Sequence, residues 1–263
     1  MSSFLNFLKR VLPYWLVVRL NALRGISYSE DADVLVRREA FYKQFLKPGD
    51  LVFDIGANYG NRVQPFLSLG CRVVAVEPQI ECTRYLNHKF GKHIHIERAC
   101  VGATRGKATL HVGRVNAVST LSEDFMRRTE ASGRFDKNMW TYSTTVNVLT
   151  LDDLIKKYGT PKFIKIDTEG YEAEVLKGIS ETVSYLSFEY TLPEFEKELR
   201  DILAMLERKG RMKINVSRGE EMSFRLDQWV SLQEWLSILD KDVDRFNGWG
   251  DVYVSYEHPQ KET

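Results

Sequence analysis

The amino-acid sequence predicts an α/β protein with a Rossmann-like, largely parallel sheet, and three observations support this prediction. From Asp50 onward, strand-like and helix-like segments alternate, as they do when parallel strands are joined by right-handed crossovers. A glycine-rich turn, DIGANYG at residues 54–60, follows the first strand. An apolar strand at residues 164–166 runs into the acidic residues Asp167 and Glu169 and then into a helix. The chain of 263 residues is long enough for one such domain with additions.

The first half of the domain is expected to contain three strands separated by helices. The strands are short apolar runs, and the second helix places Cys82, Leu86 and Phe90 at helical spacing. In order, we expect a strand at 51–55, a helix at 60–69, a strand at 72–77, a helix through 82–90 and a strand at 93–97.

The second half begins with two strands that bracket a polar insertion at residues 113–145. Insertions of this length are commonly functional. In order, we expect strands at 107–112 and 144–150, a helix at 151–159, the fourth sheet strand at 162–166, the fifth at 185–189, a helix at 193–209, a strand at 213–217, a helix at 232–239 and a last strand at 251–256. This order gives seven core strands and two additional ones.

Charge and cysteine content exclude several classes of function. Lysine and arginine total 37 against 36 for aspartate and glutamate, so the chain lacks the basic excess of a general nucleic-acid-binding protein. The three cysteines, Cys71, Cys82 and Cys100, are odd in number and have no CxxC spacing. This pattern is typical of reduced thiols in a cytoplasmic protein.

Residues 1–46 are expected to form a helical arm ahead of the domain, which we place at residues 47–258, with a tail at 259–263. The first 25 residues are amphipathic, but their apolar run is too short to span a bilayer. Arg19 ends that run, and no cleavage pattern of a signal peptide follows. We expect the arm to pack on the domain, and weak peripheral membrane contact is the alternative.

The turn at residues 54–60 predicts a nucleoside pocket without a phosphate-binding loop. Gly56 and Gly60 let the backbone approach a ligand, but their GxxxG spacing lacks the GxGxxG that lays a pyrophosphate on a helix terminus. Glu77 ends the second strand, where a carboxylate can accept hydrogen bonds from ribose hydroxyls. S-adenosylmethionine, which has a ribose and an amino-acid tail but no phosphate, fits this pattern. We expect its site to contain Asp54, Gly56, Ala57, Asn58, Gly60, Glu77 and Pro78.

The acidic end of the fourth strand has two interpretations. Ligands in open α/β sheets bind at the carboxyl ends of strands, so Asp167 and Glu169 are candidates for chemistry. Alternatively, Asp167 or Thr168 caps the helix that follows Gly170, because acidic groups suit a helix amino terminus. This segment alone leaves both interpretations open.

Four motifs together resemble the FkbM family of S-adenosylmethionine-dependent methyltransferases. They are DIGANYG at 54–60, VEP at 76–78, LTLDDL at 149–154 and IKIDTEGYEAEVLKG at 164–178. The resemblance covers about residues 48–190 and implies a class I methyltransferase fold, with a seven-stranded sheet whose last strand is antiparallel. It also implies O-methylation of sugars or natural products. The insertion at 113–145 matches little of the family and is expected to be an acceptor-binding lid.

We expect the carboxylates at two neighbouring strand ends to carry the chemistry. Asp167 at the end of the fourth strand is the candidate general base or acceptor anchor, with Glu169 and with Glu189 at the end of the fifth strand in support. No metal is expected, although Asp167 and Glu189 could bind magnesium. Lys165 could hold an anionic acceptor, but pairing with a neighbouring acid is favoured.

The sequence therefore predicts an S-adenosylmethionine-dependent O-methyltransferase acting on a glycan or a polyhydroxylated small molecule. Transfer to the nitrogen of a small amine is the first alternative, since an amine needs less base than a hydroxyl. An NAD-dependent oxidoreductase is the second, although the GxGxxG motif is missing. Trp140, Tyr142 and Trp249 could stack on a sugar ring or, alternatively, pack in the core or lid.

Overall fold

The structure is a computed structural model that describes residues 31–114, 118–134 and 139–256. Within these ranges, a seven-stranded sheet has the strand order β3-β2-β1-β7-β8-β10-β9. Its strands are β1 (Leu51–Ile55), β2 (Arg72–Val76), β3 (Ile94–Glu97), β7 (Phe163–Ile166), β8 (Tyr185–Leu192), β9 (Met212–Arg218) and β10 (Gly248–Tyr256). Neighbouring strands from β3 to β8 are parallel, whereas β10 is antiparallel to both β8 and β9. The predicted Rossmann-like sheet with an antiparallel last strand is confirmed.

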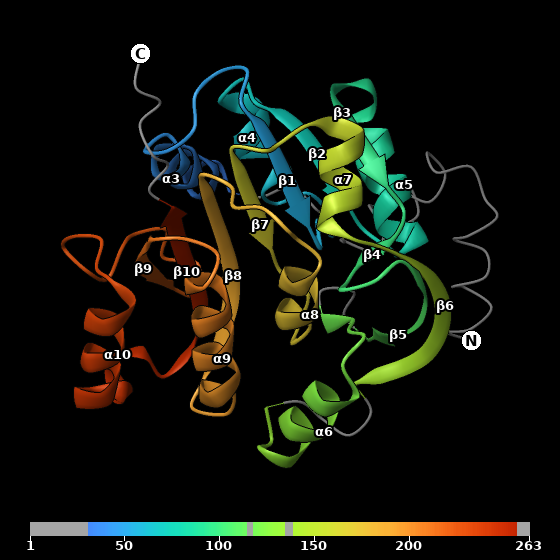
Figure 1. The fold of residues 1–263 in the computed structure, drawn as a ribbon. Helices are drawn as coiled ribbons and strands as arrows, with labels where there is room; N and C mark the ends of the chain where they lie inside the picture. Colours follow the sequence, from blue (N-terminus) through green and yellow to red (C-terminus); the bar gives the residue numbers. More distant parts are fainter. Residues whose placement is uncertain (1–30, 115–117, 135–138, 257–263) are drawn as a thin grey trace.

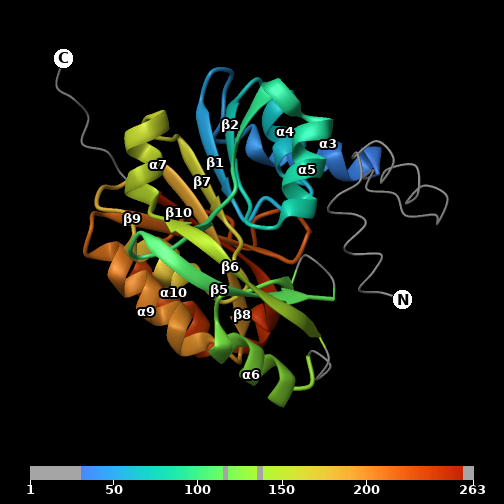
Figure 2. The ribbon, with the colours of Figure 1, turned by 90° about the vertical axis from the view of Figure 1, so that its right-hand side faces the viewer.

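Helices cover both faces of this sheet. Figure 2 shows α3, α4 and α5 on one side, and α7, α9 and α10 on the other. The α-helices that accompany the main sheet are α3 (Ala32–Tyr42), α4 (Val63–Ser68), α5 (Ile80–Lys89), α7 (Leu151–Tyr158), α8 (Glu172–Lys177), α9 (Glu196–Glu207) and α10 (Leu232–Lys241). Two short 3-10 helices are η1 (Gly91–His93) and η3 (Val243–Phe246).

The interior strand β1 is buried along its whole length, and its side chains alternate between two cores. Val52 packs in the core beneath α3 and α4, whereas Phe53 and Ile55 pack in the core on the opposite face. Asp54 has the same parity as Val52, and successive side chains of a strand point to opposite faces. The buried carboxyl group of Asp54 therefore lies on the α3 side of the sheet.

Local signals in the sequence explain where α7 and α10 begin. Thr150 and Asp153 form a capping box at the start of α7, and Ser231 and Glu234 form one at the start of α10. Gly159 follows α7 with a φ of 96°, which is favourable for glycine. These caps satisfy amide groups that the helices leave free.

The insertion lies between two strands of a small second sheet and carries a helix. Strands β4 (Cys100–Val101), β5 (Gly106–Gly113) and β6 (Trp140–Leu149) form this sheet in the order β4-β6-β5. The strands β5 and β6 are longer than predicted, since they pair antiparallel almost to the end of β5. Between them lies α6 (Glu123–Ala131). Figure 1 shows the small sheet and α6 beyond the carboxyl ends of the parallel strands.

Two predicted boundaries are wrong. Glu189 does not end its strand, because β8 continues to Leu192 and pairs along this length with β10. The first helix does not start at Gly60, because Gly60 has a φ of 78° and α4 begins only at Val63. Glu189 therefore projects from within a strand.

The helix α3 is the described part of the predicted amino-terminal arm. Asp31 caps it, and its residues Phe41 and Tyr42 are buried against the main domain. The amphipathic segment at residues 1–25 and the tail at 259–263 lie outside the described residues. None of the helices in the described part of the chain has the length and apolar character that a bilayer crossing needs.

Candidate active site

The turn after β1 lies directly against the end of β7. Gly56 has a φ of 83°, and a Cβ atom at this position would lie 1.8 Å from the carbonyl oxygen of Asp167. Only glycine fits there, so the backbone of the turn packs directly against the backbone at the carboxyl end of β7. Gly60 ends the same turn, and a side chain there would clash, because its Cβ position lies 2.6 Å from the ring of Phe90.

Glu77 is held at the end of β2 by backbone amides. Its Oε2 accepts a hydrogen bond from the amide of Asn58 at 2.9 Å, and its Oε1 accepts one from the amide of Gln79 at 2.8 Å. Burial raises the pKa of Glu77 to about 7, although these two hydrogen bonds act in the opposite direction. The carboxyl group is thus fixed in orientation beside Pro78.

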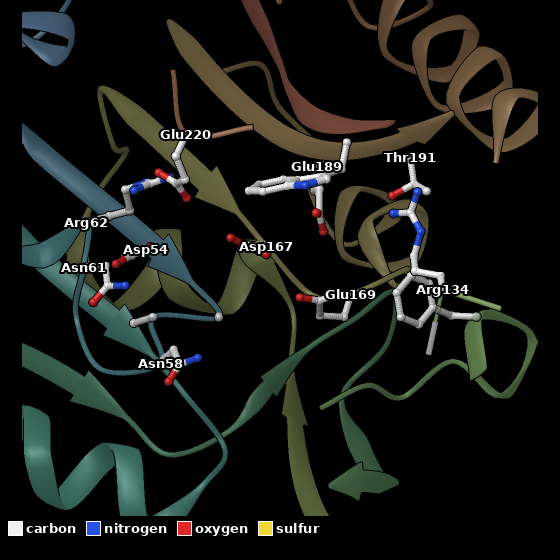
Figure 3. A pocket seen from close by; sticks show the side chains of 14 residues that line it. Asp54, Asn58, Asn61, Arg62, Arg134, Asp167, Glu169, Glu189, Thr191 and Glu220 are labelled. Atoms are coloured by element: carbon white, nitrogen blue, oxygen red, sulfur yellow. The ribbon is translucent and has the colours of Figure 1, made fainter. Parts of the chain in front are cut away.

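Two adjoining pockets open at this edge, and Gly56, Asn58, Asp167 and Glu169 line both of them. The larger pocket has a volume of about 430 Å³ and the smaller, which contains Glu77 and Pro78, about 50 Å³. The larger pocket is lined by Asp54, Gly56, Ala57, Asn58, Asn61, Arg62, Phe125, Arg134, Asp167, Glu169, Glu189, Thr191, Glu220 and Trp249 (Figure 3). Of the predicted site residues, Gly60 lines neither pocket.

Asp54 is a buried acid with an unused oxygen. The residue is 2% exposed, and its Oδ2 has no hydrogen-bond partner among the described residues. Burial raises the pKa of Asp54 to about 7, while the charges of Lys165 and Arg62 oppose this rise. Such a group favours a cationic or hydrogen-bonding ligand.

Lys165 pairs with neighbouring acids, as the favoured interpretation of the sequence predicted. Its Nζ lies 2.8 Å from Oδ1 of Asp251 and 3.2 Å from Oδ2 of Asp167. Burial lowers the pKa of Lys165, but the two carboxylates outweigh it and hold this pKa above its ordinary value. Lys165 is 1% exposed, so it positions Asp167 from beneath the pocket.

The three predicted catalytic carboxylates come together. Oxygen atoms of Asp167, Glu169 and Glu189 all lie within 4.8 Å of one another. Burial, and then the neighbouring carboxylates, raise the pKa of Glu169 and of Glu189 well above their ordinary values. The cluster can take up protons or donate hydrogen bonds to a ligand, and its donor set is also one that magnesium prefers.

The capping interpretation is wrong, because α8 has Tyr171 at its N-cap position and no side chain caps the helix, whereas Glu172 of α8 bonds to Thr168 in the loop before it. Oε1 of Glu172 accepts hydrogen bonds from the amide and the hydroxyl of Thr168, both at 2.9 Å. Asp167 points elsewhere, toward Lys165. Neither Asp167 nor Thr168 therefore caps α8, and Asp167 remains a candidate for chemistry.

The insertion is attached to the same loop. The hydroxyl of Thr120 donates a 2.7 Å hydrogen bond to the carbonyl oxygen of Glu169, a residue with a φ of 53°. A Cβ atom on Gly170 would lie 2.4 Å from the ring of Phe125 in α6. Phe125 in turn stacks on Phe195, with ring centroids 5.5 Å apart. The small sheet and α6 thus pack directly on the acidic loop.

Sequence reasoning missed several residues of the larger pocket. Arg62 and Glu220 form an ion pair at 2.8 Å on one side of the pocket, and Thr191 and Arg134 lie on the other (Figure 3). Arg62 follows the glycine turn closely and could have been found from that position. Glu220 lies 158 residues away from it and has no local signal.

Comparison with known protein families gives a match over most of the chain. The family model described as methyltransferase FkbM domain matches residues 54–241. No curated protein matches the chain.

Several solved structures show a distant similarity to the chain. The O-methyltransferase from Bacillus cereus in complex with SAH is 11% identical, with 96% of each chain covered and a TM-score of 0.41. A TehB-like SAM-dependent methyltransferase from Corynebacterium glutamicum is 12% identical, with 93% of this chain and 96% of that chain covered and a TM-score of 0.41. An rRNA methylase from Streptococcus thermophilus is 9% identical, with 84% and 94% covered and a TM-score of 0.42.

Proposed function

This chain belongs to the methyltransferase FkbM domain family and is an S-adenosylmethionine-dependent methyltransferase, and from this premise we propose that it methylates a hydroxyl of a sugar or a similar polyhydroxylated molecule. The family match disfavours the alternative of an NAD-dependent oxidoreductase. The glycine turn supports the same choice, since it lacks the GxGxxG of a dinucleotide site.

The residues at the carboxyl edge fit S-adenosylmethionine. The unpartnered Oδ2 of Asp54 suits the ammonium group of an amino-acid tail. Gly56 lies close to Asp167 and presents only backbone atoms to the pocket. Glu77 presents an oriented carboxyl group for the ribose hydroxyls. We propose that Ala57, Asn58 and Pro78 complete the site, as they line the two pockets.

The observation that carries the choice of acceptor is the combination of carboxyl groups and an exposed indole in one pocket. Asp167, Glu169 and Glu189 can hydrogen-bond to several hydroxyls at once. Trp249 lines the same pocket and is 44% exposed, so part of its indole ring is accessible to a ligand. A sugar ring has hydroxyls that can bond to the three carboxyl groups and an apolar face that can stack on the indole of Trp249.

In this proposal, Asp167 takes the proton of the acceptor hydroxyl. S-adenosylmethionine, when bound, supplies a methyl group that its sulfonium makes electrophilic. The carboxylate of Asp167 would take the proton of the acceptor hydroxyl as its oxygen accepts the methyl group, with S-adenosylhomocysteine as the leaving group. Glu169 and Glu189, whose raised pKa favours the protonated form, donate hydrogen bonds that orient the acceptor.

The test is methyl transfer to a panel of mono- and oligosaccharides, scored as a one-methyl mass gain. Asp167→Asn should lower turnover on a hydroxyl about 10²- to 10⁴-fold while S-adenosylhomocysteine still binds. Trp249→Ala should raise KM for the sugar. Tyr142→Ala is the matched control, because Tyr142 is 37% exposed but lies outside the larger pocket.

Transfer to nitrogen is a second candidate, favoured by the same carboxylates. The three acidic groups, whose oxygen atoms lie within 4.8 Å of one another, would also form hydrogen bonds with an amine. An amine acceptor needs less base, so Asp167→Asn should then cost only a modest factor. Methylation of amines but of no sugar in the panel would replace the first proposal with this one.

A further inference from the structure

Arg62 is a buried cation in the wall of the larger pocket. It precedes the first turn of α4 and is 8% exposed. Figure 3 shows it with Asp54, Asn61 and Glu220 on one side of Asp167, while Glu169 and Thr191 lie on the other side. The pocket therefore has a side away from the acceptor carboxylates that carries both a buried acid and a buried guanidinium.

The ion pair of Arg62 does not use the whole guanidinium group. Its Nη2 donates to both carboxylate oxygens of Glu220 at 2.8 Å. Its Nε is buried without a hydrogen-bond partner in the described part of the chain. A guanidinium has five donors, and an unused buried donor costs free energy until a ligand satisfies it.

Glu220 is also shared between two cations. Nη2 of Arg38 lies 3.0 Å from its Oε2, so two buried guanidinium groups surround one carboxylate. The side chain of Glu220 is 47% exposed, whereas those of Arg38 and Arg62 are 4% and 9% exposed. Because Arg38 and Arg62 share one carboxylate, the guanidinium of Arg62 keeps a donor with which it can bind a second carboxylate.

We propose that Arg62 binds the carboxylate of the methionyl tail of S-adenosylmethionine, with Asp54 receiving its ammonium group. Two buried groups of opposite charge, each with an unused hydrogen-bonding atom, line one pocket and match an α-amino acid zwitterion. The inference rests on the cofactor and is independent of the acceptor.

The same contacts connect the cofactor site to α3. Nη1 of Arg38 donates a 3.1 Å hydrogen bond to the carbonyl oxygen of Asn61, the residue before Arg62. Arg38 thus holds the loop in place and shares Glu220 with Arg62. In this arrangement α3 helps to position Arg62, the residue proposed to bind the cofactor carboxylate, although α3 does not line the pocket itself.

Calorimetry with three ligands tests the proposal on the full chain. S-adenosylhomocysteine has both charged groups, its decarboxylated analogue keeps only the ammonium, and 5′-methylthioadenosine has neither. Arg62→Met should weaken S-adenosylhomocysteine about 10- to 100-fold and leave the other two within about twofold. Arg62→Lys should give an intermediate loss for S-adenosylhomocysteine alone. Arg37→Met, at an exposed arginine of α3, is the control and should change none of the three.

Each other outcome would overturn the proposal. Unchanged binding of S-adenosylhomocysteine by Arg62→Met would show that its carboxylate lies elsewhere. An equal loss for all three ligands would show that Arg62 only supports the fold, and binding of 5′-methylthioadenosine reports whether the variant pocket is intact. If the unaltered protein binds none of the three, the cofactor assignment fails with it. A sugar panel without product, but with the expected binding pattern, would refute only the proposed acceptor.

Discussion

Lys165 and Asp251 form a buried ion pair, 2.8 Å long, between two strands that are not neighbours in the sheet. Lys165 belongs to β7 and Asp251 to β10, and β8 runs between them. Because Lys165 also contacts Asp167 at 3.2 Å, the antiparallel end of the sheet helps to position the proposed base.

Replacing Lys165 by methionine should destabilise the protein by about 3–5 kcal/mol, because it leaves the buried Asp251 without its counter-charge. Lys157→Met is the matched control, since the pair of Lys157 with Glu97 is formed by a side chain that is 60% exposed. That change should cost at most about 1 kcal/mol. Urea unfolding of both variants measures the difference, and similar losses would contradict the role given to Lys165.

The free energy of unfolding of the ligand-free protein should fall as pH rises from 5 to 8. Burial raises the pKa of Asp54 and of Glu77 to about 7, and raises those of Glu169 and Glu189 as well. The unfolded chain loses these protons near pH 4, so across this window the folded state binds more protons and stability declines with pH. Groups with lowered pKa, such as Asp153, are ionised in both states and add no slope.

Denaturant unfolding at pH 5.5 and 8 measures this decline, which should reach at least about 2 kcal/mol. S-adenosylhomocysteine should stabilise more at pH 8, because its ammonium group favours the ionised form of Asp54. Asp54→Asn should flatten both dependences. A stability that is constant or rises over this range would refute the assignment.

Thr120→Val should lower turnover about tenfold with little change in affinity for S-adenosylhomocysteine. The hydroxyl of Thr120, which is 1% exposed, holds the carbonyl of Glu169 at 2.7 Å and so fixes a residue with left-handed backbone. Losing a buried hydrogen bond costs about 1–3 kcal/mol. Thr120→Ser keeps the hydroxyl and should restore turnover. Equal losses in both variants would indicate a packing role only.

Gly56→Ala should abolish cofactor binding. The added Cβ would lie 1.8 Å from the carbonyl oxygen of Asp167, and the φ of 83° is strained for alanine. Gly106→Ala is the control, since nothing lies within 4 Å of that Cβ position and the change should alter stability by no more than about 0.5 kcal/mol. Calorimetry and thermal unfolding compare the two. Retained binding in Gly56→Ala would show that the turn lies away from the cofactor.

Full turnover is expected after treatment with a chelator. Although Asp167, Glu169 and Glu189 could hold magnesium, the ammonium of Lys165 lies 3.2 Å from Asp167 and repels a second cation. The raised pKa of Glu169 and Glu189 favours protons over a metal ion at these sites. Loss of activity in EDTA that magnesium restores would instead establish a metal-dependent enzyme.

Local patterns predicted much of the fold, because the parallel strands are apolar runs that end at glycine, proline or acidic residues. β1 occupies the predicted residues 51–55, and Asp167 follows β7 as expected. Contacts between distant segments could not be predicted in this way. Lys165 and Asp251 are 86 residues apart in the chain. The position of Glu189 inside β8 depends on pairing with β10, and this pairing cannot be predicted from the local sequence.

Within the described ranges, the small sheet β4-β6-β5 shares no strand with the main sheet. Its register is set by pairing between β5 and β6 alone, apart from the short β4. Substitutions and length changes there leave the strand pairing of the main sheet, and with it the glycine turn, untouched. The segment is nevertheless joined to the acidic loop where the hydroxyl of Thr120 holds the carbonyl oxygen of Glu169, so new side chains can be placed beside that loop without altering the strand pairing of the main sheet.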